Sequence, residues 1–311
     1  MIKTVFRRFI HLFSQPRISV LNFVVLTKEF WPDKLYLSIL FWGHMGKKMN
    51  WKNPQTFSEK LQWLKLYNRK PEYTMMVDKI KVKDYVASVL GEEYIIPTLG
   101  VWDDPDKIDF DDLPDRFVLK CNHNSGTGMY ICKDKSKMDV EKVKEELRKG
   151  LAENYFLSNR EWPYKYVPRR ILAEKYIDPA SNVQDLPDYK WYCFDGEPKY
   201  CQVIQDRNTC ETIDFFDTDW NHQEFVGLNP AAGSAVVPPD RPAHLSTHIR
   251  IARELSKGIP FSRIDLYESE HNTFFGEITF YPASGFGEFR PSQYNEILGK
   301  MLELHREERI G

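Results

Sequence analysis

The strongest constraint on the fold is a change of sequence pattern near residue 116. Before that point, apolar residues recur at the spacing of an amphipathic helix over residues 57–67 and 73–91. After it, short strand-like segments alternate with turns rich in glycine and proline, as in RFVLKC, RILAEKYI and YKWYCFDGE. Helices grouped at the front and antiparallel strands behind them predict an α+β fold.

Local signals place the helix boundaries. We expect Thr56 or Ser58 to start the first of these helices, and Pro71 to close it. A single second helix is expected over residues 73–91, with Gly91 at its end. A last helix is expected over about residues 291–306.

Charge and cysteine content exclude several classes of protein. The formal net charge is −2 and the sequence pI is about 6.5, so the chain lacks the basic footprint of a nucleic-acid-binding protein. The five cysteines include no C-x-x-C pair, which argues against a disulfide framework or a thiolate zinc site. A reducing, cytoplasmic compartment fits this pattern.

The first 13 residues combine apolar and basic side chains at helical spacing. They have neither the long apolar run of a membrane span nor the cleavage site of a signal peptide. Two interpretations remain open. The segment is either a helix that packs on the protein core, or one that lies on the inner surface of an anionic membrane.

The segment NHNSGTG, residues 122–128, separates two predicted strands. Gly126 and Gly128 allow backbone N–H groups to approach a ligand, and Lys120 at the end of the preceding strand is placed to reach a phosphate. The pattern of a P-loop is absent. The segment is therefore either an anion-binding loop or an ordinary long hairpin turn.

Asp265 and Glu277 flank a predicted turn near residues 269–273. If the turn is centred on His271, the two carboxylates lie opposite each other, where cross-strand Cβ atoms are about 5 Å apart. Carboxylates this close repel unless a cation lies between them, and magnesium binds such oxygen ligands together with phosphate. Arg263 falls on the same face. The alternative is a charged, solvent-exposed hairpin.

The segment AEKYIDP ends a predicted strand. Glu174, Tyr176 and Ile177 stand where a short stretch of exposed backbone with apolar neighbours can hold an adenine ring. The alternative for this segment is an edge strand with solvated charges.

The order of these segments resembles the ATP-grasp superfamily. The phrases NPQTFSEKLQWLKLYNRKPEYT, VDKIKVKDYV, LPDRFVLKCNHNSG and FGEITFYPASGFG are similar to the TupA-like branch, which is named for a teichuronopeptide biosynthesis protein and is often found with capsule genes. The resemblance implies two α+β lobes that clasp ATP. It divides the chain into a helical region (1–70), a linker helix and short strand (71–115), a small lobe with the phosphate loop (116–177) and a large lobe with the metal site (178–311).

The resemblance also implies residue roles in nucleotide binding. Lys79 and Lys120 match lysines that contact the nucleotide, Glu174 to Ile177 match the adenine hinge, and Asp188 matches the acidic residue at the ribose. The phosphate loop would comprise Asn122, Asn124, Ser125, Gly126, Thr127 and Gly128.

For the metal, the resemblance implies that Asp265 and Glu277 bind Mg²⁺, with Arg263 and Lys120 as catalytic residues. Many ATP-grasp enzymes have an E-x-N pattern here, whereas this chain has Thr279 in place of the Asn. A hydroxyl is a poorer ligand than an amide oxygen, so Thr279 is a weak candidate for metal binding. Ser284 and Gly285 fall in the loop that usually faces the acyl phosphate.

The activity implied is an ATP- and Mg²⁺-dependent ligation of a carboxylate to an amine, in surface-polysaccharide biosynthesis. Two other functions stay open at this point. One is a glycosyltransferase, because Asp217-Thr218-Asp219 has the Asp-x-Asp form that suits nucleotide sugars. The other is a non-catalytic nucleotide-binding scaffold, which the basic N-terminal segment and Thr279 would suit.

Overall fold

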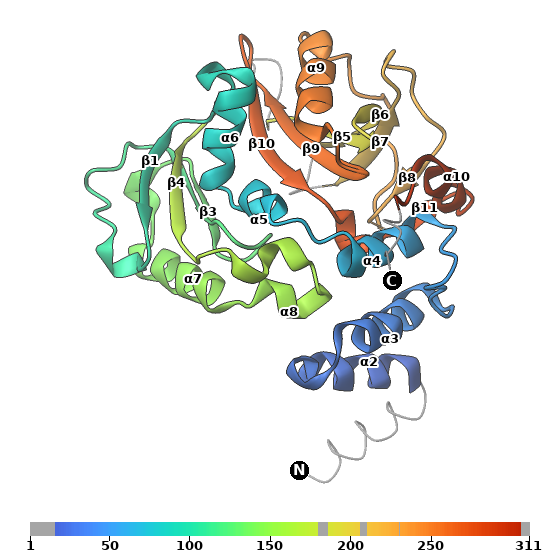
Figure 1. The fold of residues 1–311 in the computed structure, drawn as a ribbon. Helices are drawn as coiled ribbons and strands as arrows, with labels where there is room; N and C mark the ends of the chain where they lie inside the picture. Colours follow the sequence, from blue (N-terminus) through green and yellow to red (C-terminus); the bar gives the residue numbers. More distant parts are fainter. Residues whose placement is uncertain (1–15, 180–185, 206–209, 230, 306–311) are drawn as a thin grey trace.

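The structure is a computed structural model that describes residues 16–179, 186–205, 210–229 and 231–305. Two larger antiparallel sheets and the helices around them form this part of the chain (Figure 1). The predicted α+β class is therefore confirmed. The N-terminal residues 1–13, with their predicted amphipathic helix, lie outside the described residues. Among the described helices, none is both long enough and apolar enough to cross a membrane.

The larger sheet has the order β10-β9-β5-β6-β7. Its strands are β5 (Asp188–Phe194), β6 (Glu197–Gln205), β7 (Thr212–Phe216), β9 (Phe261–Glu268) and β10 (Thr273–Thr279). Helix α9 (Leu245–Ser256) packs on one face through β5, β6 and β9. On the opposite face, Phe57 of helix α4 contacts Phe194 and Phe261. Both faces are covered, so every residue of β5 is buried.

The smaller sheet has the order β1-β4-β2-β3. Its strands are β1 (Thr98–Trp102), β2 (Phe117–Cys121), β3 (Met129–Cys132) and β4 (Ile171–Lys175). Val143 and Leu147 of helix α7 (Val140–Ala152) pack on its apolar face, against Phe117 and Ile171. Its edge strand β1 comes from the range 71–115. A third, two-stranded sheet joins β8 (Val226–Gly227) to β11 (Phe289–Arg290).

The N-terminal helices are α2 (Pro16–Leu26), α3 (Asp33–Met45) and α4 (Phe57–Tyr67), and α2 and α3 lie at the lower edge of Figure 1. The predicted start of α4 is confirmed. The Thr56 hydroxyl accepts from the Glu59 backbone N–H at 3.3 Å, and the Glu59 carboxylate accepts from the Thr56 N–H at 3.0 Å. This reciprocal capping satisfies two backbone donors that a helix start leaves unpaired.

The prediction of one helix over residues 73–91 is wrong. The segment forms two helices, α5 (Glu72–Val77) and α6 (Lys81–Leu90), separated by an extended Asp78. The Asp78 carboxylate accepts from the Ile80 backbone N–H at 3.0 Å and from the Asn122 side chain at 2.8 Å. Asp side chains compete with the helix for backbone donors, and here the tertiary contact to Asn122 adds to that competition.

Shorter helical segments complete the chain. These are α8 (Tyr155–Asn159), α10 (Tyr294–Met301) and the 3-10 turns Lys28–Phe30, Glu92–Tyr94, Pro105–Lys107, Lys135–Lys137, Trp162–Tyr166 (η5) and Pro282–Gly285 (η6). Helix α10 is shorter than the predicted span of residues 291–306, because Leu302 adopts an extended conformation. The five cysteines are free, four of them buried, as expected for a chain without disulfides.

Gly299 allows α10 to approach the start of α4. A Cβ at this position would lie 2.3 Å from the Gln55 carbonyl oxygen, which is backbone and cannot move aside easily. We expect Gly299→Ala to lower the free energy of unfolding by about 1–3 kcal/mol, as overpacking of a filled core does. Urea unfolding of the full chain measures this.

Gly233→Ala is the matched control for this substitution. A Cβ at Gly233 meets no atom within 4 Å, and its backbone is outside the left-handed region. Equal stabilities of the two variants would show that the contact between α10 and α4 is not tightly packed.

Candidate active site

Asp265 on β9 and Glu277 on β10 pair directly across the hairpin, as predicted. The predicted centre of the turn is wrong, however. Near the turn Thr273 pairs with Glu268, and this register alone would place Gly276 opposite Asp265. A β-bulge between Phe275 and Glu277 shifts the pairing by one residue. Glycine suits the bulge, because a Cβ at Gly276 would lie 2.9 Å from the Tyr267 ring and 3.0 Å from the Asp265 carbonyl oxygen.

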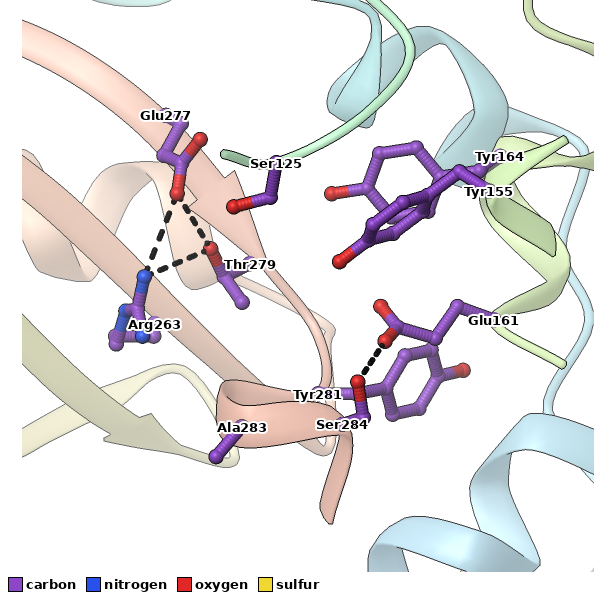
Figure 2. Close-up of a pocket in the computed structure, with 10 residues that line it drawn as sticks. All are labelled: Ser125, Tyr155, Glu161, Tyr164, Arg263, Glu277, Thr279, Tyr281, Ala283 and Ser284. Carbon is purple, nitrogen blue, oxygen red and sulfur yellow. Dashed lines mark hydrogen bonds and ion pairs between the residues drawn. The ribbon is translucent and has the colours of Figure 1, made fainter. Parts of the chain in front are cut away.

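Arg263 bridges the two carboxylates. Its Nε lies 2.7 Å from Asp265 Oδ1, and one terminal nitrogen lies 2.8 Å from Asp265 Oδ2 and 3.4 Å from Glu277 Oε1. The same nitrogen donates to the Thr279 hydroxyl at 3.1 Å, and that hydroxyl donates to Glu277 at 3.2 Å (Figure 2). The guanidinium therefore offsets the repulsion between the carboxylates, and both roles of the Thr279 hydroxyl oxygen are already in use.

The two carboxylates differ in environment. Burial raises the pKa of Asp265, even though Arg263 and Lys190 oppose that effect. Burial acts on Glu277 in the same direction, but Lys79, Arg263 and further cations outweigh it and lower its pKa to about 2. Glu277 is therefore ionised at neutral pH.

Lys190 is a member of this cluster that the sequence analysis missed. Its ammonium group contacts Asp265 and lies 2.8 Å from the Asp188 carboxylate. Asp188, predicted at the ribose, is placed at the start of β5 beside this lysine. Alternation along the strand puts both on the face opposite α9, together with Asp265. The sequence did contain a signal for this pair. Asp188 and Lys190 are charged residues two positions apart in an apolar strand, and charges buried there must have partners.

Lys79 connects the two sheets. The break between α5 and α6 directs its ammonium group to the Asn124 carbonyl oxygen at 2.5 Å and to Glu277 Oε2 at 3.8 Å. Its backbone N–H donates to the Asn122 carbonyl oxygen at 3.3 Å. Burial lowers the pKa of Lys79, while Glu277 opposes that shift. One lysine therefore holds the 122–128 loop against the carboxylate hairpin.

Glu174 is buried between two lysines. Lys120 Nζ lies 2.5 Å from one carboxylate oxygen, and Lys83 Nζ lies 2.6 Å from the other. Burial would raise the pKa of Glu174, but Lys120 and Lys83 together lower it. Strand β4 lies between β1 and β2, so the alternative of an edge strand with solvated charges is wrong. Lys83 was not predicted as a site residue, although it lies one helical turn after Lys79.

Tyr176 and Ile177 directly follow β4, as the adenine-hinge prediction requires, and both are partly exposed. The Arg116 guanidinium lies 5.4 Å from the centre of the Tyr176 ring. The structure thus places these two residues at the end of β4 in the smaller sheet.

Asn122 and Asn124 hold the 122–128 loop in place through their side chains. The Asn122 amide donates to Asp78 at 2.8 Å and to the Pro168 carbonyl oxygen at 2.9 Å. The Asn124 amide donates to Glu153 at 3.1 Å. Both residues are almost fully buried. Their side chains therefore shape the loop, and nucleotide contacts by these residues would come from the backbone.

The second half of the loop is more accessible. Ser125 and Gly126 are exposed, and Gly126 has a positive φ of 89° with no atom within 4 Å of a notional Cβ. Gly128 is packed instead, because a Cβ there would lie 2.9 Å from the Gly150 Cα of α7. Thr127 lies between these two glycines and is half-buried. The loop is thus anchored at Gly128 and open at Ser125 and Gly126.

A pocket of about 140 Å³ lies between the loop and the hairpin. Figure 2 shows Arg263, Glu277 and Thr279 on one wall and Tyr155, Tyr164 and Glu161 on the other, with Ser125 above. The lining residues are Ser125, Tyr155, Glu161, Tyr164, Arg263, Glu277, Thr279, Tyr281, Ala283 and Ser284. Four of them, Tyr155, Glu161, Tyr281 and Ala283, were not predicted as site residues.

The donor set fits magnesium in part. Glu277 is ionised, its side chain is 28% exposed and it lines the pocket, so it offers a hard oxygen ligand. Asp265 is 1% exposed, and Arg263 and Lys190 contact its carboxylate. Glu277 is therefore the accessible carboxylate of the pair, while Asp265 is shielded by the two cations.

The Asp-x-Asp motif lies elsewhere. Asp217 follows β7, at the edge of the larger sheet opposite to β10. One of its carboxylate oxygens accepts from the backbone N–H groups of Asp219 and Asn221 at 3.0 and 2.8 Å, and the other accepts from the Asn221 side chain at 2.9 Å. These contacts are those of an Asx-type turn and favour a structural role.

The structure has two antiparallel sheets, with lysines and carboxylates buried where they meet, and a glycine-containing loop on the smaller sheet. These features define an ATP-grasp fold. The chain belongs to the TupA-like ATP-grasp family, which matches residues 59–303. No curated protein matches the chain.

Solved structures of ATP-grasp ligases are similar in fold. The D-alanine–D-alanine ligase of Bacillus anthracis, complexed with ATP, is 15% identical over 66% of this chain and 54% of that one, with a TM-score of 0.38. The Helicobacter pylori D-alanine–D-alanine ligase is 12% identical, over 80% and 70% of the chains, with a TM-score of 0.40. The ligase PsnB, complexed with minimal precursor, Mg and ADP, is 11% identical over 72% and 57%, with a TM-score of 0.36. The chain thus spans little more than half the length of the first and third.

We expect Lys190→Met to lower the free energy of unfolding by about 3 kcal/mol at neutral pH, because it removes one partner of a buried ion pair. Burial already raises the pKa of Asp265, and loss of the lysine raises it further. The folded variant then binds a proton at Asp265 more readily than the unfolded chain does. The decrease in the free energy of unfolding therefore becomes smaller as the pH falls through the raised pKa of Asp265. Urea unfolding at several pH values measures this.

Two further variants serve as controls. Lys257→Met removes an exposed lysine and should leave stability nearly unchanged. The double variant Lys190→Met, Asp265→Asn should lose the pH dependence. A loss of equal size at every pH would show that Lys190 acts through packing of its aliphatic chain.

Proposed function

We propose that this protein is an ATP- and Mg²⁺-dependent ligase that joins a carboxylate to an amine through an acyl phosphate. Membership of the ATP-grasp class supports ATP-dependent carboxylate–amine ligation in general. The observation that carries the proposal is the pocket in which Arg263 and Glu277 face Ser125 of the glycine-containing loop. Such a pocket combines a cation, an ionised metal ligand and an accessible loop around one small volume.

In this proposal the phosphates of ATP lie between the loop and the hairpin. Lys79 and Lys120 are close enough to these elements to pair with phosphate oxygens, and Glu174 at present holds Lys120. Ser125, Gly126 and Thr127 would offer backbone N–H groups, since this part of the loop is accessible. Tyr176 and Ile177 would hold the adenine, and Asp188 the ribose.

Charge neutralisation and positioning would provide most of the catalysis, because phosphoryl transfer requires little covalent participation by the protein. Arg263 would stabilise negative charge that develops on the transferred phosphoryl group, with Lys120 beside the α-phosphate. Glu277 and Asp265 would hold magnesium, which supplies further neutralisation of phosphate charge when bound. The loop would exclude water from the acyl phosphate.

The substrates proposed are a sugar carboxylate, such as a uronic acid, and an amino acid, in the synthesis of a surface polysaccharide. This part rests on the resemblance to the TupA-like branch. The pocket volume of about 140 Å³ suits a small amine or carboxylate group.

Phosphate release from ATP tests the proposal. We expect the full chain with magnesium, uronic acids and amino acids to release phosphate, and Asp265→Asn and Lys120→Ala to lower the rate by about a hundredfold or more, as loss of a charged transition-state contact does. Glu145→Gln is an exposed control on α7 that should keep the wild-type rate. ATP binding with no release for any substrate pair would indicate a nucleotide-binding scaffold, and release of UDP from a nucleotide sugar would indicate a glycosyltransferase.

We further propose that the protein works at the inner surface of a membrane. Helix α2 and the turn after it expose large apolar side chains, among them Phe23 at 60%, Leu26 at 84% and Phe30 at 85%. Exposed apolar clusters of this kind mark interaction sites. Arg17 lies next to Gly46, and the exposed Lys47 and Lys48 follow it. Apolar and basic groups together suit an anionic lipid surface.

Vesicle binding tests this second part. We expect the full chain to co-sediment with vesicles that contain an anionic phospholipid, and Phe23→Asp, Leu26→Asp to weaken binding about tenfold or more, because each side chain loses its transfer into the lipid. Val236→Asp, Val237→Asp is the matched control, since these residues are exposed on a different loop. Equal binding by both variants, or a dimer that only the first variant abolishes, would contradict a lipid partner.

A further inference from the structure

Glu161 is a buried carboxylate in the pocket that the proposed ligase mechanism leaves without a role. It is 2% exposed, and its carboxylate accepts from the Ser284 hydroxyl at 2.7 Å. Among the described residues, Ser284 is its one hydrogen-bond partner. Figure 2 shows the carboxylate directed into the pocket, across from Arg263 and Glu277. An ionised oxygen there lacks the cation that buried carboxylates require.

Aromatic rings surround this carboxylate. Tyr155 and Tyr164 lie in an edge-to-face arrangement with ring centres 4.7 Å apart, and their hydroxyl groups point into the pocket in Figure 2. Tyr281 lines the pocket beside Ser284. Burial raises the pKa of all three phenols, so they stay neutral. A carboxylate beside neutral phenol oxygens, which can accept hydrogen bonds, is a combination that attracts a cationic donor.

The nearest buried cation does not satisfy Glu161 directly. Lys65 is fully buried and donates to the carbonyl oxygens of Asn159 and Ser284, at 2.9 and 2.8 Å. Burial raises the pKa of Glu161, and the attraction of Lys65 does not cancel that effect. Among the described residues no cation pairs directly with the Glu161 carboxylate, so a positive partner can reach it only from the pocket.

The backbone around Glu161 is fixed from several directions. Lys65 holds Asn159, and the Arg160 guanidinium pairs with Asp33 at 2.9 Å and lies 4.1 Å from the centre of the Tyr36 ring. Ser284, the hydrogen-bond partner of Glu161, and the neighbouring Ala283 have positive φ values of 53° and 46°, a conformation that non-glycine residues adopt only when the surroundings enforce it. A site held this firmly is preorganised for a ligand.

We propose that Glu161, Tyr155 and Tyr164 form the subsite for the amine substrate, which is recognised as a primary ammonium group. The carboxylate would accept hydrogen bonds from the ammonium ion, and the hydroxyl oxygens of the two tyrosines would accept further ones. This inference rests on the proposed ligase function, because it places the amine on the wall opposite Arg263 and Glu277. It narrows the second substrate to a small amine that carries a positive charge before it reacts.

Binding of a simple amine tests the subsite without knowledge of the natural substrate. Saturation-transfer NMR on the full chain would compare ethylammonium with ethanol, its uncharged counterpart of similar size. We expect ethylammonium but not ethanol to bind, and Glu161→Gln to weaken ethylammonium binding about tenfold or more, since a charged hydrogen bond is lost. Glu145→Gln, on the exposed face of α7, is the matched control.

A second variant keeps the test valid if Glu161→Gln does not fold. Tyr155→Leu keeps the carboxylate and removes one phenol oxygen, and we expect several-fold weaker ethylammonium binding. Ethylammonium binding that is unchanged in Tyr155→Leu and in any folded Glu161→Gln, or no binding by the wild-type chain, would overturn the proposal.

A coupling assay separates this inference from the proposed function. Hydroxylamine, which is largely uncharged at neutral pH, traps an acyl phosphate as a hydroxamate. With ATP, magnesium, uronic acids, amino acids and hydroxylamine together, we expect Glu161→Gln to lower the ratio of amide product to hydroxamate about tenfold or more. An unchanged ratio would overturn the amine subsite while the ligase function stands. If the wild-type chain forms no hydroxamate with any carboxylate, the ligase function is overturned. The ethylammonium binding experiment would still test the subsite in that case.

Discussion

The site depends on the neutralisation of buried carboxylates by cations, three of which come from distant parts of the chain. Glu174 needs Lys83 and Lys120, and Asp265 needs Arg263 and Lys190. A buried charge without a partner would destabilise the fold by several kcal/mol, so these contacts constrain the positions of the strands and the helix that carry them. They also keep the lysines directed at the volume that a nucleotide would occupy.

This arrangement links ligand binding to the contact between the sheets. Lys79 reaches both the 122–128 loop and Glu277, and Lys120 is held by Glu174. In the proposed ligase, phosphate oxygens would compete with these carboxylates for the same lysines. Exchange of one anion for another needs little reorganisation, because the cations are already desolvated and oriented.

The pocket has two walls that arise in different ways. The wall with Arg263 and Glu277 comes from strand alternation and a β-bulge, which are local features of β9 and β10. The wall with Glu161 comes from a turn that N-terminal residues fix, through the ion pair of Arg160 with Asp33 and the contact of Lys65 with Asn159. The N-terminal helices therefore contribute to the site without lining it.

Sequence alone determined the α+β class and a start of α4 at Thr56 or Ser58, because capping is a local rule. It paired Asp265 with Glu277 through a wrong turn centre, which the bulge in β10 offset. It did not place the break at Asp78, the bulge at Gly276 or the partners of Lys190. Those depend on residues far away in the chain, such as Asn122 for Asp78. Glu161 was missed for the same reason, since its surroundings come from three separate segments. Only the tertiary structure decides which charges are buried together, and that burial gives them their chemistry.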